Sequence, residues 1–185
     1  DGKIIPANTA NDGDKRFVGN GLPKFTASLS NNFRYKNFDL GIYLRGAFEY
    51  QVYNTNAFYF GTPATQSGFN TLRSAYEIGN KGFKLTNQAT SSSLSDYFLQ
   101  QGDFVKIDNV SLGYNWNAPV KYITSARFYL TGRNLYTFSY WDTGDIESIN
   151  VNGLTPGINT DANGYGSREY YPSTMQIIVG LQLKF

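Results

Sequence analysis

Apolar and polar residues alternate along five stretches of this chain. The alternation is clearest in TMQIIVGLQLKF (174–185), where every second residue from Met175 to Phe185 is apolar. A period of two predicts strands with one apolar and one polar face. Similar patterns occupy 25–35, 38–50, 104–116 and 127–140, whereas helical periodicity is hard to find. We therefore expect an all-β fold.

Only Lys36 and Asn37 separate the first two predicted strands. A two-residue hairpin places Tyr35 opposite Phe38, and the apolar rows of the two strands then coincide. The sequence thus predicts an antiparallel hairpin with one continuous apolar face.

Two of the later strands contain an irregularity. In 104–116, Val105 and Ile107 fall on the opposite side of the alternation from Val110. A β-bulge near Asp108 explains this change, as does an extension of the strand beyond a membrane. In 127–140, Asn134 interrupts the apolar row.

The connections between the predicted strands alternate between long and short. This alternation is typical of outer-membrane β-barrels, which have long outer loops and short periplasmic turns. A tilted membrane crossing needs about 9–11 residues per strand, and the predicted strands are long enough. We therefore assign segments as follows: extracellular loops at 1–24, 51–103 and 141–173; a transmembrane hairpin at 25–50; two transmembrane strands at 104–140 with a periplasmic turn at 117–126; and a closing strand at 174–185.

Aromatic residues make up 17% of the chain. Several fall where a barrel carries its aromatic girdles: Tyr35, Phe38 and Trp116 near the short turns, and Tyr136, Phe138 and Tyr140 near the long loops. The alternative is that they form the core of a soluble β-sandwich. The mean hydropathy of −0.40 does not decide between the two, because barrel strands alternate lipid-facing and lumen-facing residues.

Composition removes several kinds of chemistry. The chain has no cysteine and no histidine, and its net charge of +2 comes without a basic run. We therefore expect no thiol or histidine catalysis, no nucleic-acid partner, no cofactor and no metal, and the carboxylates have no spacing that indicates an enzyme. Asn159, Asp161 and Asn163 resemble the start of a calcium loop, but Tyr170 stands where the bidentate Glu is needed.

A few residues are candidates for contact with a substrate. The loop YWDTGDIES places Trp141 beside Asp142, Asp145 and Glu147, a combination that suits a sugar. The alternative is that Trp141 anchors the loop at the outer interface. On the polar rows of the strands, Arg133 and Tyr43 are further candidates, although charges there can also pair internally or contact a plug.

Five blocks resemble one family and occur in the same order as in that family. From the N-terminus they are DGKIIP, GNGLPKFTASLSNNFRYKNFDLGIYLRGAFEYQVYN, DYFLQQGDFVKIDNVSLGYNW, ARFYLTGRNLYTFSYWDTGDIES and YPSTMQIIVGLQLKF. They resemble the C-terminal portion of SusC-like (RagA-type) TonB-dependent outer-membrane transporters of Bacteroidetes. The resemblance implies an antiparallel transmembrane β-barrel segment, the last five strands of a 22-stranded plugged barrel. The final strand is similar to the signal that the outer-membrane assembly machinery recognises, carried by Ile177, Val179, Leu181, Leu183 and Phe185.

The resemblance also implies a function and partners. Such proteins import oligosaccharides or peptides across the outer membrane under a SusD-like surface lipoprotein. The TonB complex acts through an N-terminal region that is missing here, and transporter–lid pairs can form dimers. Two alternatives stay open: a SusC-like structural subunit of a larger outer-membrane assembly, and a soluble carbohydrate-binding β-sandwich.

Overall fold

The structure, a computed structural model, describes residues 16–61, 70–77, 95–117, 122–141, 144–148, 157 and 173–185. The chain divides into two compact units. The sheet unit consists of Lys24–Glu49, Asp103–Tyr140 and Pro172–Phe185. The loop unit consists of Asp1–Pro23, Tyr50–Gly102 and Trp141–Tyr171.

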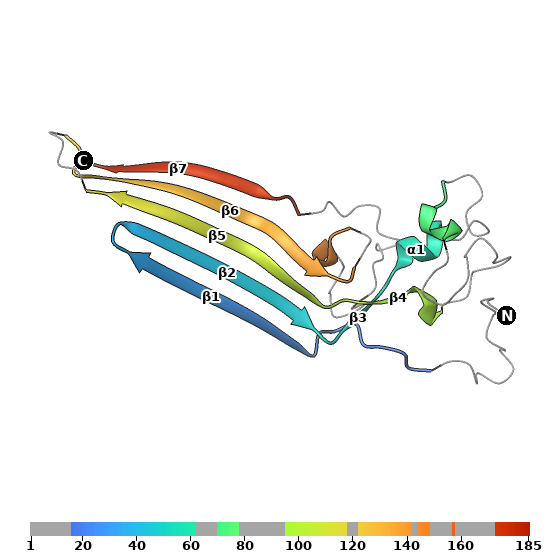
Figure 1. The fold of residues 1–185 in the computed structure, drawn as a ribbon. Helices are drawn as coiled ribbons and strands as arrows, with labels where there is room; N and C mark the ends of the chain where they lie inside the picture. The colour runs from blue at the N-terminus through green and yellow to red at the C-terminus, as the bar shows by residue number, and fades with distance from the viewer. Residues whose placement is uncertain are drawn as a thin grey trace, which may run out of the picture. The chain divides into compact units, whose positions relative to one another are not determined.

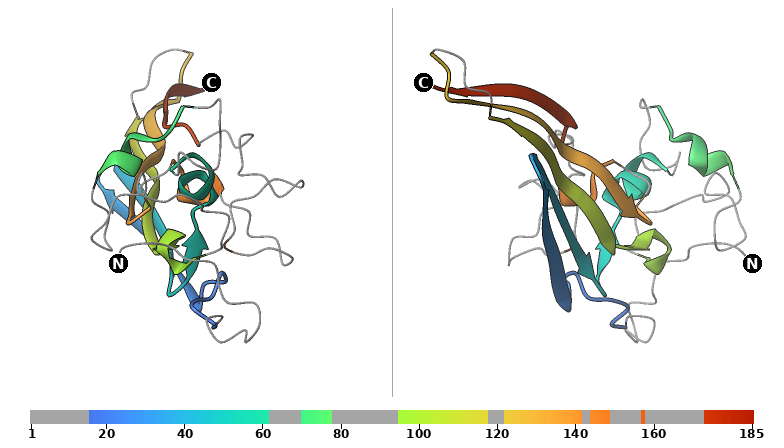
Figure 2. Two further views of the ribbon diagram at one scale, coloured as in Figure 1. Left: turned by 90° about the vertical axis from the view of Figure 1, so that its right-hand side faces the viewer. Right: turned by 60° about the vertical axis from the view of Figure 1, so that its left-hand side comes forward.

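The sheet unit is a five-stranded antiparallel sheet with the strand order β1-β2-β5-β6-β7 (Figure 1). Its strands are β1 (Phe25–Tyr35), β2 (Phe38–Phe48), β5 (Phe104–Trp116), β6 (Ser125–Ser139) and β7 (Gln176–Lys184). Figure 2 shows that the sheet twists and curves along its strands. The all-β, antiparallel prediction is confirmed.

The predicted hairpin is also confirmed. Tyr35 and Phe38 are Cα partners, and the register brings Phe33 opposite Leu40. Lys36 has a φ of 52°, the left-handed conformation that a tight hairpin turn requires. One face of β1 and β2 is therefore continuously apolar.

A bulge at Asp108 resolves the change of alternation in β5. The pairing of β2 with β5 shifts register between Tyr43 and Leu44, and the pairing of β5 with β6 shifts between Ile107 and Asn109. Ile107 thereby comes opposite Leu44, on the apolar face. The bulge interpretation is confirmed, and it makes the apolar face continuous across the sheet.

The irregularity in the alternation of β6 lies at Asn134, which adopts a left-handed backbone conformation. Its φ is 51°, a conformation that Asn tolerates better than most residues. Its Nδ2 donates to the carbonyl oxygen of Thr174, at 3.2 Å. Leu135 packs over Gly132, where an added Cβ would lie 2.6 Å from Leu135 Cδ2. Asn134 thus interrupts the apolar row and at the same time holds the chain just before β7.

The apolar face of the sheet carries large hydrophobic side chains that are exposed in this chain. The exposed fraction is 53% for Leu29, 47% for Leu130 and 79% for Val179. Aromatic pairs cross between strands on this face, with ring centroids 4.9 Å apart for Phe25 and Phe48. Among the described residues, these exposed side chains of the apolar face are therefore not part of a hydrophobic core.

β2 is two residues shorter than the predicted strand, which ran to Tyr50. It ends at Phe48 because Glu49 adopts a φ of 58°. Glu49 is held by Lys24, whose Nζ donates to Glu49 Oε2 at 2.6 Å. This contact raises the pKa of Lys24, first through the hydrogen bond and then through the attraction of the carboxylate. Tyr50 belongs to the loop unit and is buried.

The loop unit has secondary structure that the sequence pattern did not predict. β3 (Gln51–Tyr53) pairs with β4 (Leu99–Gln101), and α1 (Thr55–Phe60) follows β3. Short 3-10 helices span Arg73–Tyr76, Asp96–Phe98 and Ile146–Ser148. In the part of the chain that the structure describes, no helix has the length and apolar character needed to cross a membrane.

A small aromatic core holds the loop unit together. Phe58, Ala75 and Phe98 are buried, and Tyr53 and Tyr97 pack against them. The rings of Phe58 and Phe98 meet edge to face with centroids 5.3 Å apart. Burial raises the pKa of the Tyr97 phenol above its ordinary value of 10.0. These residues come from three segments far apart in sequence, so the excursion 51–103 contains a folded core.

Candidate functional site: the polar face of the sheet

All charged residues of the five strands belong to the polar side of the sheet. They are six cations and two carboxylates: Arg34, Arg45, Lys106, Arg127, Arg133 and Lys184 with Asp39 and Asp108. The opposite face carries no charged residue on these strands. The strong asymmetry makes the polar face the part of the sheet that can bind a polar ligand.

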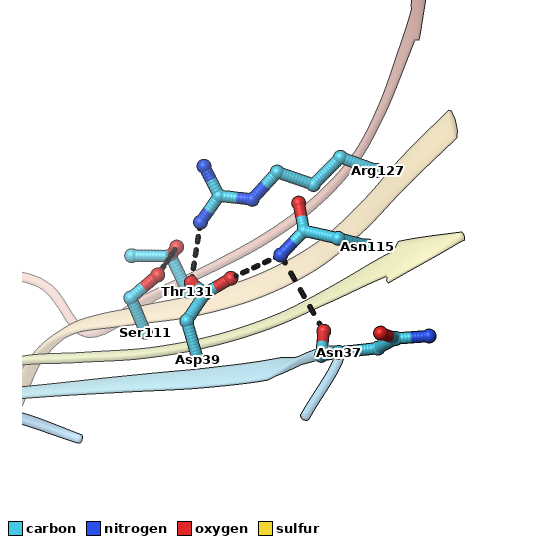
Figure 3. A network of polar contacts seen from close by, with 6 residues as sticks. All are labelled: Asn37, Asp39, Ser111, Asn115, Arg127 and Thr131. Atoms are coloured by element: carbon cyan, nitrogen blue, oxygen red, sulfur yellow. Dashed lines mark hydrogen bonds and ion pairs between the residues drawn. The ribbon is translucent and has the colours of Figure 1, made fainter. Parts of the chain in front are cut away.

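A network centred on Asp39 ties three strands together (Figure 3). Arg127 Nη2 donates to Asp39 Oδ2 at 2.5 Å, and Asn115 Nδ2 donates to Asp39 Oδ1 at 2.8 Å. Asn115 also lies 3.4 Å from the carbonyl oxygen of Asn37, in the hairpin turn. The Asp39 carboxylate is therefore satisfied by side chains of β5 and β6.

Gly113 makes this network possible. It lies on β5 directly opposite Asp39, between the two strands that carry the ion pair. A Cβ at Gly113 would lie 2.5 Å from Asp39 Oδ2 and 2.8 Å from Arg127 Nη2. The missing side chain leaves the space that the carboxylate and the guanidinium occupy.

A glycine also leaves space for a neighbouring side chain between β6 and β7. Tyr129 and Gly180 are Cα partners, and a Cβ at Gly180 would lie 2.1 Å from the Tyr129 ring. The ring thus lies across the bare backbone of β7. One step along the face, the hydroxyls of Ser111 and Thr131 are hydrogen-bonded at 3.0 Å (Figure 3).

A second group of charges surrounds the bulge. Arg45 Nε donates to Asp108 Oδ2 at 3.0 Å, so the bulged residue is held by β2. Lys106 is buried, with 2% of its surface exposed, and its Nζ lies 3.4 Å from Ser173 Oγ. The expected internal pairing of wall charges is confirmed for Arg45 and Asp39.

A hollow of about 320 Å³ lies at the hairpin end of the sheet unit. Its polar lining comprises Asn115, Asn117, Ser125, Arg127, Gln182 and Lys184. The Nε of Arg127 is buried without a hydrogen-bond partner among the described atoms. The lining offers amide, hydroxyl and cationic groups, which suit oxygen-bearing ligands.

The two wall candidates lie on the same level of the polar face. The register places Tyr43 opposite Asn109, and Asn109 opposite Arg133. Tyr43 and Arg133 are both exposed. Contact of Tyr43 and Arg133 with a substrate stays a prediction.

The loop candidates are less open than the sequence implied. Trp141 is buried, with 7% exposed, which leaves little ring surface for a sugar. Asp145 Oδ1 accepts from the backbone N–H of Glu147, at 3.0 Å, and so stabilises the local turn. Asp142 lies outside the described residues. The calcium-like segment 159–170 lies outside them as well.

The predicted girdle residues are exposed on the apolar side or at its ends: Tyr35, Phe38, Trp116, Tyr136, Phe138 and Tyr140. Tyr136 and Phe138 stack edge to face, with centroids 4.6 Å apart. The apolar residues of β7 and Phe185 are exposed too. Their roles at a membrane interface and in assembly remain predictions. Within the described ranges, no three carboxylates form a candidate metal site.

Sequence reasoning missed Arg127, Asn115 and Lys106 as members of the polar site. The hairpin fixes the register of β1 and β2, but a long excursion separates β2 from β5. The pairing of Asp39 with Arg127 depends on that long-range register. The one local signal is the glycine at 113 within an otherwise bulky strand, which indicates a close approach.

Comparison with curated proteins finds relatives that share one description. The chain is 27% identical over 179 residues to TonB-dependent receptor P3 of Formosa agariphila, covering 93% of this chain and 17% of that protein. It is 26% identical over an alignment of 189 residues to TonB-dependent receptor SusC of Bacteroides thetaiotaomicron, covering 96% of this chain and 17% of that protein. The chain thus spans about a sixth of the length of these relatives. No family model matches.

Solved structures agree on the fold. The RagAB peptide transporter superimposes with a TM-score of 0.69 at 18% identity, over 89% of this chain and 17% of that one. The RagAB peptide importer in its closed-closed state gives 0.69 at 22% identity, over 92% and 18%. The resemblance to a portion of SusC-like TonB-dependent receptors is thereby confirmed: the chain is similar to TonB-dependent receptors in sequence and has the fold of the corresponding part of a peptide importer.

Proposed function

We propose that this chain forms part of the wall of a TonB-dependent importer in the bacterial outer membrane. In this arrangement the sheet is part of a large β-barrel, its apolar face contacts lipid, and its polar face lines the lumen. The 22-strand barrel and the position of these strands at its end belong to this proposal. Two observations support the proposal: the chain is similar to TonB-dependent receptors, and its sheet has one apolar and one polar face.

The observation that carries the proposal is the separation of the two faces. Across five antiparallel strands, the charged residues gather on one side, while Leu29, Leu130 and Val179 are exposed on the other. In water, such a wide apolar face is unfavourable. In a bilayer it is stabilised, because lipid chains remove it from water.

The cargo that we propose is oligosaccharide or peptide, moved with a SusD-like lipoprotein as the lid and with energy from the TonB complex. The support comes from the matched proteins, which are named as SusC and as a peptide importer. The loop unit, with its own aromatic core, would form part of the outer loops at the lid side. Assembly through the last strand and pairing of transporter–lid units belong to the same proposal.

Three experiments on the full-length receptor test this function. Deletion of its gene should abolish uptake of its cargo, and removal of TonB should have the same effect. The protein should be extracted only with detergent, together with a surface lipoprotein. Uptake that persists after deletion of the gene, for a full-length protein without a TonB-contacting segment, would instead favour a structural subunit of an outer-membrane assembly.

A soluble sugar-binding sandwich is the less favoured reading. A sandwich requires a second sheet over the apolar face, whereas large side chains of that face, such as Leu29, Leu130 and Val179, are exposed. Trp141, its proposed binding platform, is buried. Extraction of the full-length protein in water without detergent would favour that reading.

A further inference from the structure

One level of the polar face carries a row of five polar side chains that runs across the whole sheet. The pairing register places Ser30, Tyr43, Asn109, Arg133 and Gln176 directly opposite one another, on β1, β2, β5, β6 and β7. We call these residues the Arg133 row. Ser30, Tyr43, Arg133 and Gln176 are exposed. The row contains hydroxyl, phenol, amide and guanidinium donors and no carboxylate.

Arg133 differs from the buried and paired cations of the same face. Among the described residues, the ion pairs join Lys24 to Glu49, Arg45 to Asp108, Arg73 to Glu77 and Arg127 to Asp39. Neither carboxylate of the face pairs with Arg133, because Asp39 and Asp108 are held by Arg127 and Arg45. The Arg133 guanidinium is therefore an exposed cation on a face with excess positive charge.

The bulge lies next to this row. The register of β5 and β6 shifts between Ile107 and Asn109, immediately beside the Asn109–Arg133 pair. Bulges commonly re-aim side chains next to binding sites. Here the bulge also removes Asp108 from the row, because Asp108 turns to Arg45. The geometry thus directs the Asp108 carboxylate to Arg45 and not to Arg133.

From this arrangement we propose that the Arg133 row binds a carboxylate group of the transported cargo. This deepens the proposed function, since it rests on the polar face lining the import path. Arg133 contributes a fork of N–H donors that fits a carboxylate bidentately. Tyr43, Asn109 and Gln176 donate to further oxygens of the cargo on either side. The carboxylate belongs either to an acidic peptide or to a uronic-acid glycan.

The test uses the full-length receptor with its co-purifying lipoprotein, in detergent, and four probes. These are a hexapeptide rich in Asp, its Asn counterpart, a galacturonate oligomer and the neutral galactose oligomer. We expect one acidic probe to bind at least about tenfold more tightly than its neutral counterpart, because charge-assisted hydrogen bonds are about twice as strong as neutral ones. The class of the acidic probe that binds identifies the source of the carboxylate.

Variants then locate the site. Arg133→Gln should lower the affinity for the acidic probe about tenfold and leave the neutral probe unchanged, whereas Arg133→Lys should recover part of the loss. Arg34→Gln is the matched control, because Arg34 lies on the same face opposite Asp39 and outside the row; its effect should stay within about twofold. Heat-modified gel migration checks that each variant is folded.

Three results overturn the inference. They are equal binding of acidic and neutral probes, no effect of Arg133→Gln, or an equal loss with Arg34→Gln, which would indicate a diffuse charge effect. These results leave import itself intact, since uptake of a neutral cargo would continue. Failure of the folded receptor to bind any probe, with uptake unaffected by removal of TonB, contradicts both the inference and the proposed function.

Discussion

Asp39 on β2 and Arg127 on β6 form an ion pair across the intervening strand β5, with 2.5 Å between Oδ2 and Nη2. Gly113 on β5 leaves the space in which the two side chains meet. The pair therefore joins strands that do not themselves pair, and a single glycine permits it. Both side chains are partly exposed, so solvent weakens the ion pair itself. The close approach at Gly113 is the stronger constraint.

Gly113→Ala is expected to destabilise the folded receptor by about 1–3 kcal/mol, the usual cost of overpacking. The new methyl group would displace the Asp39 carboxylate and the Arg127 guanidinium. Urea titration of the full-length receptor folded into lipid vesicles measures the loss. Gly41→Ala is the control, because a Cβ at Gly41 would lie 3.2 Å from Asn32 Oδ1, a looser contact. Equal losses for both variants would contradict the special role of Gly113.

Asn134 supplies a second prediction, because its φ of 51° is unfavourable for most side chains. Asn134→Val should destabilise by about 1–3 kcal/mol, since a β-branched residue is strained in this conformation. Asn134→Gly should keep the backbone and lose only the hydrogen bond to Thr174. Amide exchange at the start of β7 reports the loss of this anchor. If Val is tolerated as well as Gly, the left-handed conformation is not required.

The sequence predicts local features of this fold better than long-range ones. The two-residue turn and the alternation determine the β1–β2 hairpin, and the opposed parity of Ile107 and Val110 indicates the bulge. Charges on the polar rows can pair internally, but Arg127, the partner of Asp39, lies on a strand whose register depends on long-range packing. Local patterns do not specify such a register.

Local sequence patterns also fail to predict the structure of the loop unit. Its aromatic core combines Phe58 and Phe98, separated by a long stretch without a clear period. α1 is only six residues long, too short for a recognisable apolar stripe. Its one local signal was Asn54, whose Oδ1 accepts from the Ala57 N–H at 2.8 Å. The sequence pattern likewise did not predict the burial of Trp141, because this burial depends on tertiary packing.

Phe98 is the most informative position in the aromatic core of the loop unit. It is 2% exposed, so Phe98→Ala should cost about 3–5 kcal/mol through the cavity that it leaves. We expect faster amide exchange throughout β3, α1 and β4, while the hairpin β1–β2 keeps its protection. Tyr76→Ala, at a position with 58% exposure, is the control and should leave the exchange unchanged. Unchanged exchange in Phe98→Ala would show that this core does not hold the loop unit together.

The Tyr97 phenol is expected to make the stability of the folded state depend on pH. Burial raises its pKa above the ordinary 10.0, so the folded state favours the neutral phenol. The stability from this group is present below pH 10 and is lost as the pH rises through the raised pKa, because the unfolded chain releases its proton first. Difference absorbance of phenolate formation, wild type minus Tyr97→Phe, should show a midpoint above pH 10. A midpoint at or below the ordinary value would contradict the burial of this phenol.

The most direct test of the central claim is single-cysteine labelling along β6, because the claim is that one face of this sheet meets lipid and the other meets water. The chain has no cysteine of its own. In the full-length receptor, freed of other cysteines and kept in outer membranes, Cys would replace Phe128, Tyr129, Leu130 and Thr131 in turn. We expect a water-soluble maleimide to label positions 129 and 131, and a lipid-soluble reagent to label 128 and 130. Equal labelling of neighbouring positions by the water-soluble reagent would contradict a membrane-spanning wall.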